Sequence, residues 1–360
     1  MIQDSFLKSF RETKSPFITN PYRFAGAAAV GGWVELGRTT LGSAGDNITV
    51  SSLPDKRYYM VLAHTLASTS SQSQVQMGNT TIDTGSNYSG RWSNSGGADG
   101  TQVSQSDISI SDTNSTTAFE MGYISNLSGK EKLGQFWNIL QNTAGSSTSP
   151  SRTESVGKWA NTSNPLDIVN WFNRNANSYN TNSELVVLGW DPADTHTTNF
   201  WEELASVDLS GGAADTLDSG TFSAKKYLWV QTYIKAVSGT VEPDSQFNSD
   251  TGSNYADRYN INGGSDGTGT SLTTGVRGSG VPYSAFFNDF IINNASNEKL
   301  VIRHVIYPPA SGAASAPSRR ETVGKWANTS SQITSIQWKE NSGGAGQFDT
   351  GSIIKVFGSD

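Results

Sequence analysis

The sequence predicts an all-β protein: two tandem homologous antiparallel β-sandwich domains of a jelly-roll-like kind, preceded by an extended N-terminal arm. The first observation behind this prediction is a duplication. The segment ESVGKWANTS at 154–163 returns as ETVGKWANTS at 321–330, and DTGSNY at 83–88 returns unchanged at 250–255, each pair 167 residues apart. A unit of this length is a whole domain with its own core, because solenoids and propellers repeat every 20 to 50 residues, roughly.

The second observation is the composition. Charged residues make up only 16% of the chain, and short runs of Val, Ile, Tyr, Phe and Trp are separated by clusters of Gly, Asn, Asp and Ser. This pattern is typical of short antiparallel strands joined by turns. We expect strands at 33–38, 47–50, 57–66, 74–77, 119–124, 132–140, 166–172 and 185–190, and in the second copy at 227–235, 285–292, 299–307, 333–338 and 353–357. Helical turns are expected only at 4–10 and 200–204.

The repeat also indicates the domain organisation. The expected parts are an arm (1–31), a first sandwich (32–191), a linker (192–198) and a second sandwich (199–360). So short a linker favours a fixed or narrowly hinged orientation, and we expect the two sandwiches to form a rod. The polar, Gly-rich stretches 90–114 and 263–279 are expected to be surface loops.

The arm has no counterpart in the second half of the chain. It contains no apolar run of the length that a secretory signal or a membrane span requires, so no membrane partner is expected. It does carry large apolar side chains on a segment too short to fold alone. We expect these side chains to become ordered in a groove of a neighbouring subunit. The partner-anchoring residues are Phe6, Phe10, Phe17, Tyr22 and Phe24.

Charge and cysteine content exclude several function classes. The net charge of −7 and the scattered basic residues argue against nucleic acid as a partner, since phosphate binding needs clustered Lys and Arg. Zero cysteines exclude disulfides, thiolate metal sites and a thiol nucleophile. The three histidines show no metal-binding spacing, and no metal site is predicted. Bound Ca²⁺ is the one cofactor left open, at the loops 44–47, 96–100 and 263–267.

One Asp-Thr-Gly in each half resembles the two-lobed aspartic proteases, with Asp83 and Asp250 as the two carboxylates. That chemistry requires the carboxylates to lie face to face and share one proton. Polar residues precede both motifs where that family has an apolar strand, and DTGS occurs a third time at 349–352. We therefore favour a turn, in which Asp caps the loop and Gly takes a positive φ, and we predict no catalytic residue.

Three tryptophans are candidates for binding. Trp159 and Trp326 occupy the repeated VGKWANTS motif, and Trp92 lies among polar residues. An exposed Trp beside Asn or Lys can stack on a sugar ring or anchor an interface. A Trp that recurs in both copies of a sandwich can equally fill its core, with the indole N–H donating to a carbonyl. For Trp159 and Trp326 we favour the core.

Together, these features resemble virion structural proteins of tailed bacteriophages, especially marine phages. The resemblance rests on the Cys-free duplicated β-modules, with stretches such as GRTTLGSAGDNITVSSLPDKRYY at 37–59 and SNYADRYNINGG at 253–264, behind a short arm. It implies a non-enzymatic protein of the virion that decorates the capsid or builds a tail or fibre appendage. It also implies other virion proteins as partners and a symmetric homo-oligomer, with a trimer among the expected states. The alternative is a tandem carbohydrate-binding, lectin-like module that binds a host-surface glycan.

Overall fold

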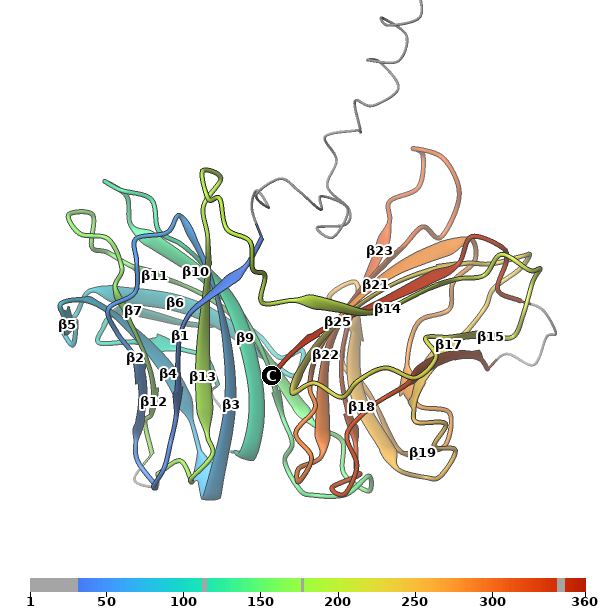
Figure 1. The fold of residues 1–360 in the computed structure, drawn as a ribbon, viewed down its shortest axis with the longest axis horizontal. Helices are drawn as coiled ribbons and strands as arrows, with labels where there is room; N and C mark the ends of the chain where they lie inside the picture. The colour runs from blue at the N-terminus through green and yellow to red at the C-terminus, as the bar shows by residue number, and fades with distance from the viewer. Residues whose placement is uncertain (1–31, 112–114, 176–177, 342–346) are drawn as a thin grey trace, which may run out of the picture.

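The computed structural model describes residues 32–111, 115–175, 178–341 and 347–360. Within these ranges the chain forms strands and no helix, which confirms the prediction of an all-β fold built from antiparallel β-sandwiches. No helix long and apolar enough to cross a membrane occurs in the described ranges. Figure 1 shows two β-units side by side, one from each half of the chain. The arm, its five anchoring aromatics and the helical turn expected at 4–10 lie outside the described residues.

The first unit, which we call module 1, contains two sheets. The order of its larger sheet is β1 (Val34–Thr40), β13 (Glu184–Trp190), β3 (Tyr58–Ser71), β9 (Ser115–Ser125), β10 (Lys132–Leu140), β11 (Ser151–Trp159), β6 (Tyr88–Asn94) and β7 (Gly100–Gln105). The order of its smaller sheet is β2 (Asn47–Val50), β12 (Ile168–Asn173), β4 (Ser73–Asn79) and β5 (Thr81–Ile82), and β8 (Ile108–Ser109) also pairs with β4.

The second unit, module 2, repeats this arrangement. The order of its larger sheet is β14 (Glu202–Asp208), β25 (Ile353–Ser359), β16 (Tyr227–Lys235), β21 (Ser284–Ile292), β22 (Lys299–Tyr307), β23 (Ser318–Trp326), β18 (Tyr255–Ile261) and β19 (Gly267–Leu272). The order of its smaller sheet is β15 (Thr216–Asp218), β24 (Ile336–Glu340), β17 (Pro243–Phe247) and β20 (Val276–Arg277). The register is also repeated, since Lys132 pairs with Trp159 and Lys299 with Trp326. The sequence repeat is therefore a repeat of topology.

Each module has a core between its two sheets. In module 1, Phe136 of the larger sheet meets Trp171 of the smaller sheet edge to face, with ring centroids 6.1 Å apart. In module 2, Phe287 packs on Trp338 with centroids 4.3 Å apart. Burial of such side chains is the main favourable term in folding, and it compensates for the lack of disulfides.

A third apolar cluster joins the two modules through the outer faces of their larger sheets. Module 1 contributes Met60, Leu62, Phe119, Met121, Ile139, Val186 and Leu188. Module 2 contributes Tyr227, Phe290, Ile292, Leu300, Ile302, Val323 and Phe357, together with Phe200 and Trp201 at its start. The expectation of a rod is therefore wrong. The larger sheets are apolar on both faces, so the modules pack face to face instead of end to end.

Polar groups close the edges of this interface. The buried Glu184 of module 1 accepts hydrogen bonds from Lys226 at 2.8 Å and from the Tyr227 hydroxyl at 2.7 Å in module 2. Arg152 pairs with Asp266 across the interface at 2.9 Å. In the linker, Asp194 contacts Lys56 of module 1. These contacts fix the modules in one relative orientation.

The structure corrects two further expectations from the sequence, one about loops and one about a helical turn. The stretches 90–114 and 263–279, expected to be loops, contain β7, β8, β19 and β20 and most of the β6–β7 hairpin. The polar sequence of β7 and β19 reflects their position at the edge of each larger sheet, where backbone pairing continues without a fully buried side-chain face, whereas β8 and β20 pair within the smaller sheets. The helical turn expected at 200–204 is instead the approach to β14, which begins at Glu202.

Candidate functional site

The two repeated motifs of the sequence meet in space. The Trp159 side chain is 1% exposed, and its indole N–H donates a 2.7 Å hydrogen bond to Oδ2 of Asp83. In module 2 the indole N–H of Trp326 donates to Asp250 at the same distance. Burial of both indoles corrects the expectation that Trp159 and Trp326 serve as glycan or interface aromatics, and it agrees with the core position that we favoured.

Each of these aspartates also organises its own turn. Asp83 accepts hydrogen bonds from the Gly85 amide at 2.8 Å and from the Asn87 side chain at 2.8 Å. Partial burial acts to raise the pKa of Asp83, but the hydrogen bonds from Trp159, Gly85 and Asn87 together hold that pKa below its ordinary value. The pKa of Asp250 is lowered by the corresponding groups against the same effect of burial.

This arrangement bears on the protease interpretation. A catalytic dyad needs two carboxylates in contact, one of them with a raised pKa. Here the pKa values of Asp83 and Asp250 are both lowered, and each carboxylate accepts a hydrogen bond from the Trp of its own module. The geometry is that of the turn we favoured, with each carboxylate joining a hairpin to a core tryptophan.

The loops considered for Ca²⁺ have other contacts. In 96–100, Asp99 pairs with Arg91 at 3.0 Å, and in 263–267, Asp266 pairs with Arg152. In 44–47, Asp46 accepts a hydrogen bond from Ser178. Among the residues that the structure describes, no group of three or more His, Asp or Glu side chains is placed to hold a metal ion.

An open groove of about 1000 Å³ lies on the outer face of the larger sheet of module 1. Its floor includes Leu133 of β10 and Val156 of β11, and its far wall includes Val103 of β7. All three side chains are exposed, at 56%, 51% and 71%. Soluble proteins seldom expose adjoining large apolar side chains without a partner, so this groove is a candidate contact surface.

Aromatic residues line the other wall of the groove, beside the interface between the modules. Tyr58 and Trp190 are stacked, with centroids 5.4 Å apart and an interplanar angle of 18°. Trp33 packs on Tyr123 at 5.9 Å, and both rings also contact the apolar cluster between the modules. Burial raises the pKa of Tyr123 to about 12, so its hydroxyl remains protonated at neutral pH. The groove is thus continuous with the interface between the modules.

Trp92, the third candidate tryptophan, lies next to this groove. It is half-buried and lines a smaller cavity of about 210 Å³ with Arg91, Asp99 and Trp137. Of the candidate tryptophans, Trp92 alone reaches a surface that a ligand could approach. Sequence reasoning missed the groove itself. Its signal was the outward position of Leu133 and Val156 in strands whose inward residues fill the core.

The three histidines have different surroundings. His64 is buried in β3, where burial lowers its pKa to about 3. His304 packs edge to face on Trp137 at 5.1 Å. His196 contacts the Thr198 carbonyl in the linker.

No protein-family model matches the sequence, and no curated protein matches it. Among solved structures, mouse laminin alpha1 chain domains LG4-5 are similar over 92% of this chain and 90% of that chain, at 9% identity and a TM-score of 0.19. Neisserial surface protein A is similar over 79% of this chain and 99% of its own length, at 7% identity and a TM-score of 0.12. At these TM-scores neither likeness carries an argument about function.

Proposed function

We propose that the protein is a non-enzymatic structural component of a virus particle, which decorates the capsid or builds a tail or fibre appendage. The observation that carries this proposal is the open apolar groove on module 1, because Leu133 and Val156 lie exposed on a sheet face of the kind that the chain elsewhere buries. Exposed apolar faces of this extent are typical of proteins that assemble. The resemblance of the sequence to virion structural proteins of tailed bacteriophages suggests that this assembly is a virion.

In this proposal residues 1–31 attach the protein to other virion proteins, and the two modules are the displayed part. The test compares particles formed with the full chain and with a chain that lacks residues 1–31, purified on a density gradient and analysed by quantitative mass spectrometry. We expect the shortened chain to be absent from particles while its thermal unfolding is unchanged. Equal incorporation of the two chains would refute the anchoring role, and absence of the full chain from particles would refute the virion role.

A second candidate function is carbohydrate binding, which the stacked pair Tyr58–Trp190 favours. Paired aromatic rings beside amide side chains such as Gln102 and Gln135 are suited to stack on a sugar ring and bind its hydroxyls. A glycan array with the wild type, Trp190→Ala and the control Tyr283→Ala, at an exposed aromatic residue of module 2 outside the groove, tests this function. Loss of a glycan signal only in Trp190→Ala supports it. Absence of any signal in the wild type contradicts it.

A further inference from the structure

The two modules pack against each other through different halves of the same face. Module 1 contributes the half that contains Phe119 and Ile139. Module 2 contributes the half that contains Leu300 and Val323. Because the two larger sheets have the same topology and register, each module also possesses the half that the other one uses. One half of each face is therefore left over.

The unused half of module 1 is the groove. Leu133 and Val156 on its floor occupy the positions that Leu300 and Val323 occupy in module 2, as the β10–β11 and β22–β23 registers show. Leu300 and Val323 are 0% and 4% exposed, whereas Leu133 and Val156 are more than half exposed. The groove is thus an open version of the surface on which module 2 receives module 1.

The unused half of module 2 carries the opposite surface. Phe286 and Ile306 occupy the positions of Phe119 and Ile139 in module 1. Phe119 and Ile139 are buried in the interface at 1% and 0%, whereas Phe286 and Ile306 are 40% and 56% exposed. The chain therefore exposes both sides of an interface that it also forms once internally.

Charged residues are also buried on the half of each face that forms the internal contact and exposed on the unused half. The buried pair between the modules joins Arg152 of module 1 to Asp266 of module 2, with side chains 6% and 3% exposed. The equivalent residues, 167 positions away in each case, are Arg319 of module 2 and Asp99 of module 1. Their side chains are 56% and 50% exposed. Opposite charges therefore lie on the two unused halves at corresponding positions.

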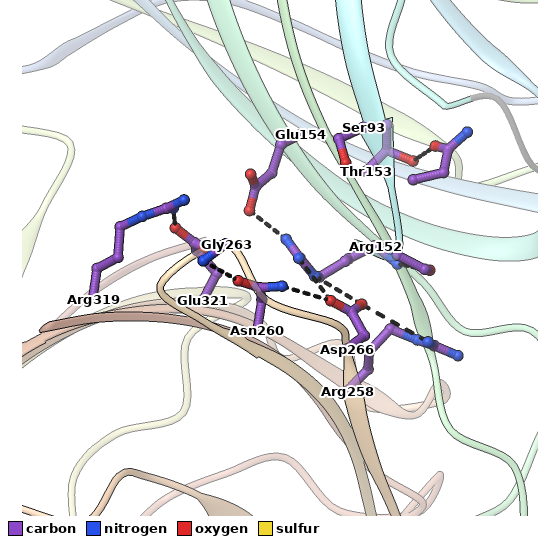
Figure 2. Close-up of polar contacts among 12 residues, drawn as sticks. Ser93, Arg152, Thr153, Glu154, Arg258, Asn260, Gly263, Asp266, Arg319 and Glu321 are labelled. Carbon is purple, nitrogen blue, oxygen red and sulfur yellow. Dashed lines mark hydrogen bonds and ion pairs between the residues drawn. The ribbon is translucent and has the colours of Figure 1, made fainter. Parts of the chain in front are cut away.

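Both exposed charges make ion pairs within their own module that correspond to those of their buried equivalents. Figure 2 shows Arg152 between Glu154 and Asp266, and Arg319 in contact with Glu321, which is the counterpart of Glu154. Asp99 is held by Arg91 as Asp266 is approached by Arg258. Side chains that are ordered before contact lose less entropy when a partner arrives.

A loop completes the correspondence. Loop 141–150 of module 1 rests on module 2, where Lys325 donates hydrogen bonds to two of its carbonyl groups at 3.2 and 2.5 Å. The equivalent loop of module 2, 308–317, is largely exposed, and the side chain of Lys158, the counterpart of Lys325, is 42% exposed and pairs with Glu131. The glycine of each loop has a positive φ, 88° in module 1 and 86° in module 2. The second loop thus has the turn geometry that the first uses in its contact.

We propose that a second copy of this chain binds in the groove of module 1 and presents the unused half of its own module 2. In this contact Arg319 of one copy pairs with Asp99 of the other, loop 308–317 rests beside Lys158, and Phe286 and Ile306 cover the groove floor. The contact between chains repeats the contact within a chain, so every module meets its neighbours in the same way. The inference rests on the proposed structural role and specifies how that structure is assembled.

The internal contact also indicates the form of the assembly. It joins two different halves of the face and is therefore head to tail, while the equivalent residues Trp137 and His304 meet each other at 5.1 Å. Equivalent residues meet where a rotation axis passes nearby. Head-to-tail contacts repeated about such an axis form a closed ring when the rotation closes, and a helical filament otherwise.

The proposed contact is more polar than the internal one. Asn288 and Lys355 of module 2 stand where module 1 has the buried Met121 and Val186. Interfaces between chains that are also exposed to water before assembly carry more polar groups than a permanent core. We therefore expect association to be reversible and dependent on protein concentration.

The test is a charge exchange in the full-length chain, measured by sedimentation velocity over a range of protein concentrations. The variants are Asp99→Arg, Arg319→Asp and the double variant, with Asp218→Arg on the exposed side of β15 as the matched control. We expect the wild type and the control to associate, each single variant to associate about tenfold more weakly or worse, and the double variant to regain most of the loss. Both charges are at the surface, so circular dichroism is expected to be unchanged in all four variants.

Three outcomes overturn the inference. The first is a wild type that remains a 38.5 kDa monomer at every concentration. The second is association that the single variants leave intact or the double variant does not restore. The third is association that is lost on deletion of residues 1–31 but insensitive to the charges, which would place the arm in the groove. Particle incorporation is measured separately, so a monomer found in particles refutes the inference alone, and a self-associating chain absent from particles refutes the virion role alone.

Discussion

Replacing Asp83 with alanine removes the acceptor for the indole N–H of Trp159. The indole is 1% exposed, so the substitution leaves its N–H at the core without the carboxylate that accepts its hydrogen bond. The same substitution removes the hydrogen bonds to Gly85 and Asn87 that order the turn. We therefore expect Asp83→Ala to destabilise the fold, although the side chain lies at the edge of the core.

The magnitude follows from the hydrogen bonds. A hydrogen bond to a charged acceptor contributes about 1.5–3 kcal/mol to the free energy of unfolding. In a module of this size, each kcal/mol lost lowers the unfolding midpoint by about 2–4 °C. Asp83→Ala should therefore lower the midpoint by roughly 5–10 °C. Asp250→Ala should have an effect of the same size, because its contact with Trp326 has the same length.

The pH dependence has a defined sign. Since the pKa of Asp83 in the folded protein lies below its ordinary value of 3.8, its stabilising contribution is complete above that pH and is lost as the pH falls through the folded pKa. The difference in stability between the wild type and Asp83→Ala is thus largest near neutral pH and shrinks in acid.

Differential scanning calorimetry at pH 7 and pH 3 measures both effects. The matched control is Asp349→Ala, in the third DTGS copy, where the carboxylate meets Lys235 at the surface and holds no tryptophan. We expect the control to melt close to the wild type. Equal melting of Asp83→Ala, Asp250→Ala and the wild type would refute the reasoning, and loss of a peptide-cleaving activity in Asp83→Asn with unchanged melting would support the protease instead.

Further predictions concern buried charges. Burial raises the pKa of Glu120 to about 7, so the free energy of unfolding falls as the pH rises from 4.5 to 7. Glu120→Gln should remove this fall, which is about 2 kcal/mol at pH 8 when measured by urea unfolding. A fall in the variant as steep as that of the wild type would contradict this. Burial lowers the pKa of His64, so stability is lost as the pH drops below 6.5, and His64→Leu should unfold at higher urea than the wild type at pH 5 but lose this advantage at pH 8. In module 2 the buried pair Arg303–Asp289 stands where module 1 has Phe and Gly, so Arg303→Phe alone should cost about 3–5 kcal/mol and adding Asp289→Gly should restore part of it; additive losses would contradict a shared site.

The strands that the sequence predicted best are those in the middle of the larger sheets. The expected ranges 132–140, 227–235 and 299–307 coincide with β10, β16 and β22. One face of each strand lies in a module core and part of the other face lies in the contact between the modules, so apolar residues recur along the strand. The hairpins at the sheet edge were missed, because polar strands such as β7 lack any apolar alternation that distinguishes them from loops.

The candidate site was less accessible to sequence reasoning. The repeats identified Asp83 and Trp159 separately, but their contact joins residues 76 positions apart and depends on how β4, β6 and β11 meet. The groove depends on how the two modules pack against each other. Leu133 and Leu300 are the same residue in the same motif, and only the arrangement of the modules leaves one exposed and the other buried.

The central claim is that the groove of module 1 binds another copy of the chain. A cryo-electron microscopy map of the purified, associated protein tests it directly. The account predicts that loop 308–317 of a second copy lies along the groove and that its Arg319 is within ion-pair distance of Asp99. A map in which the groove is open to solvent, or is filled by residues 1–31, would contradict it.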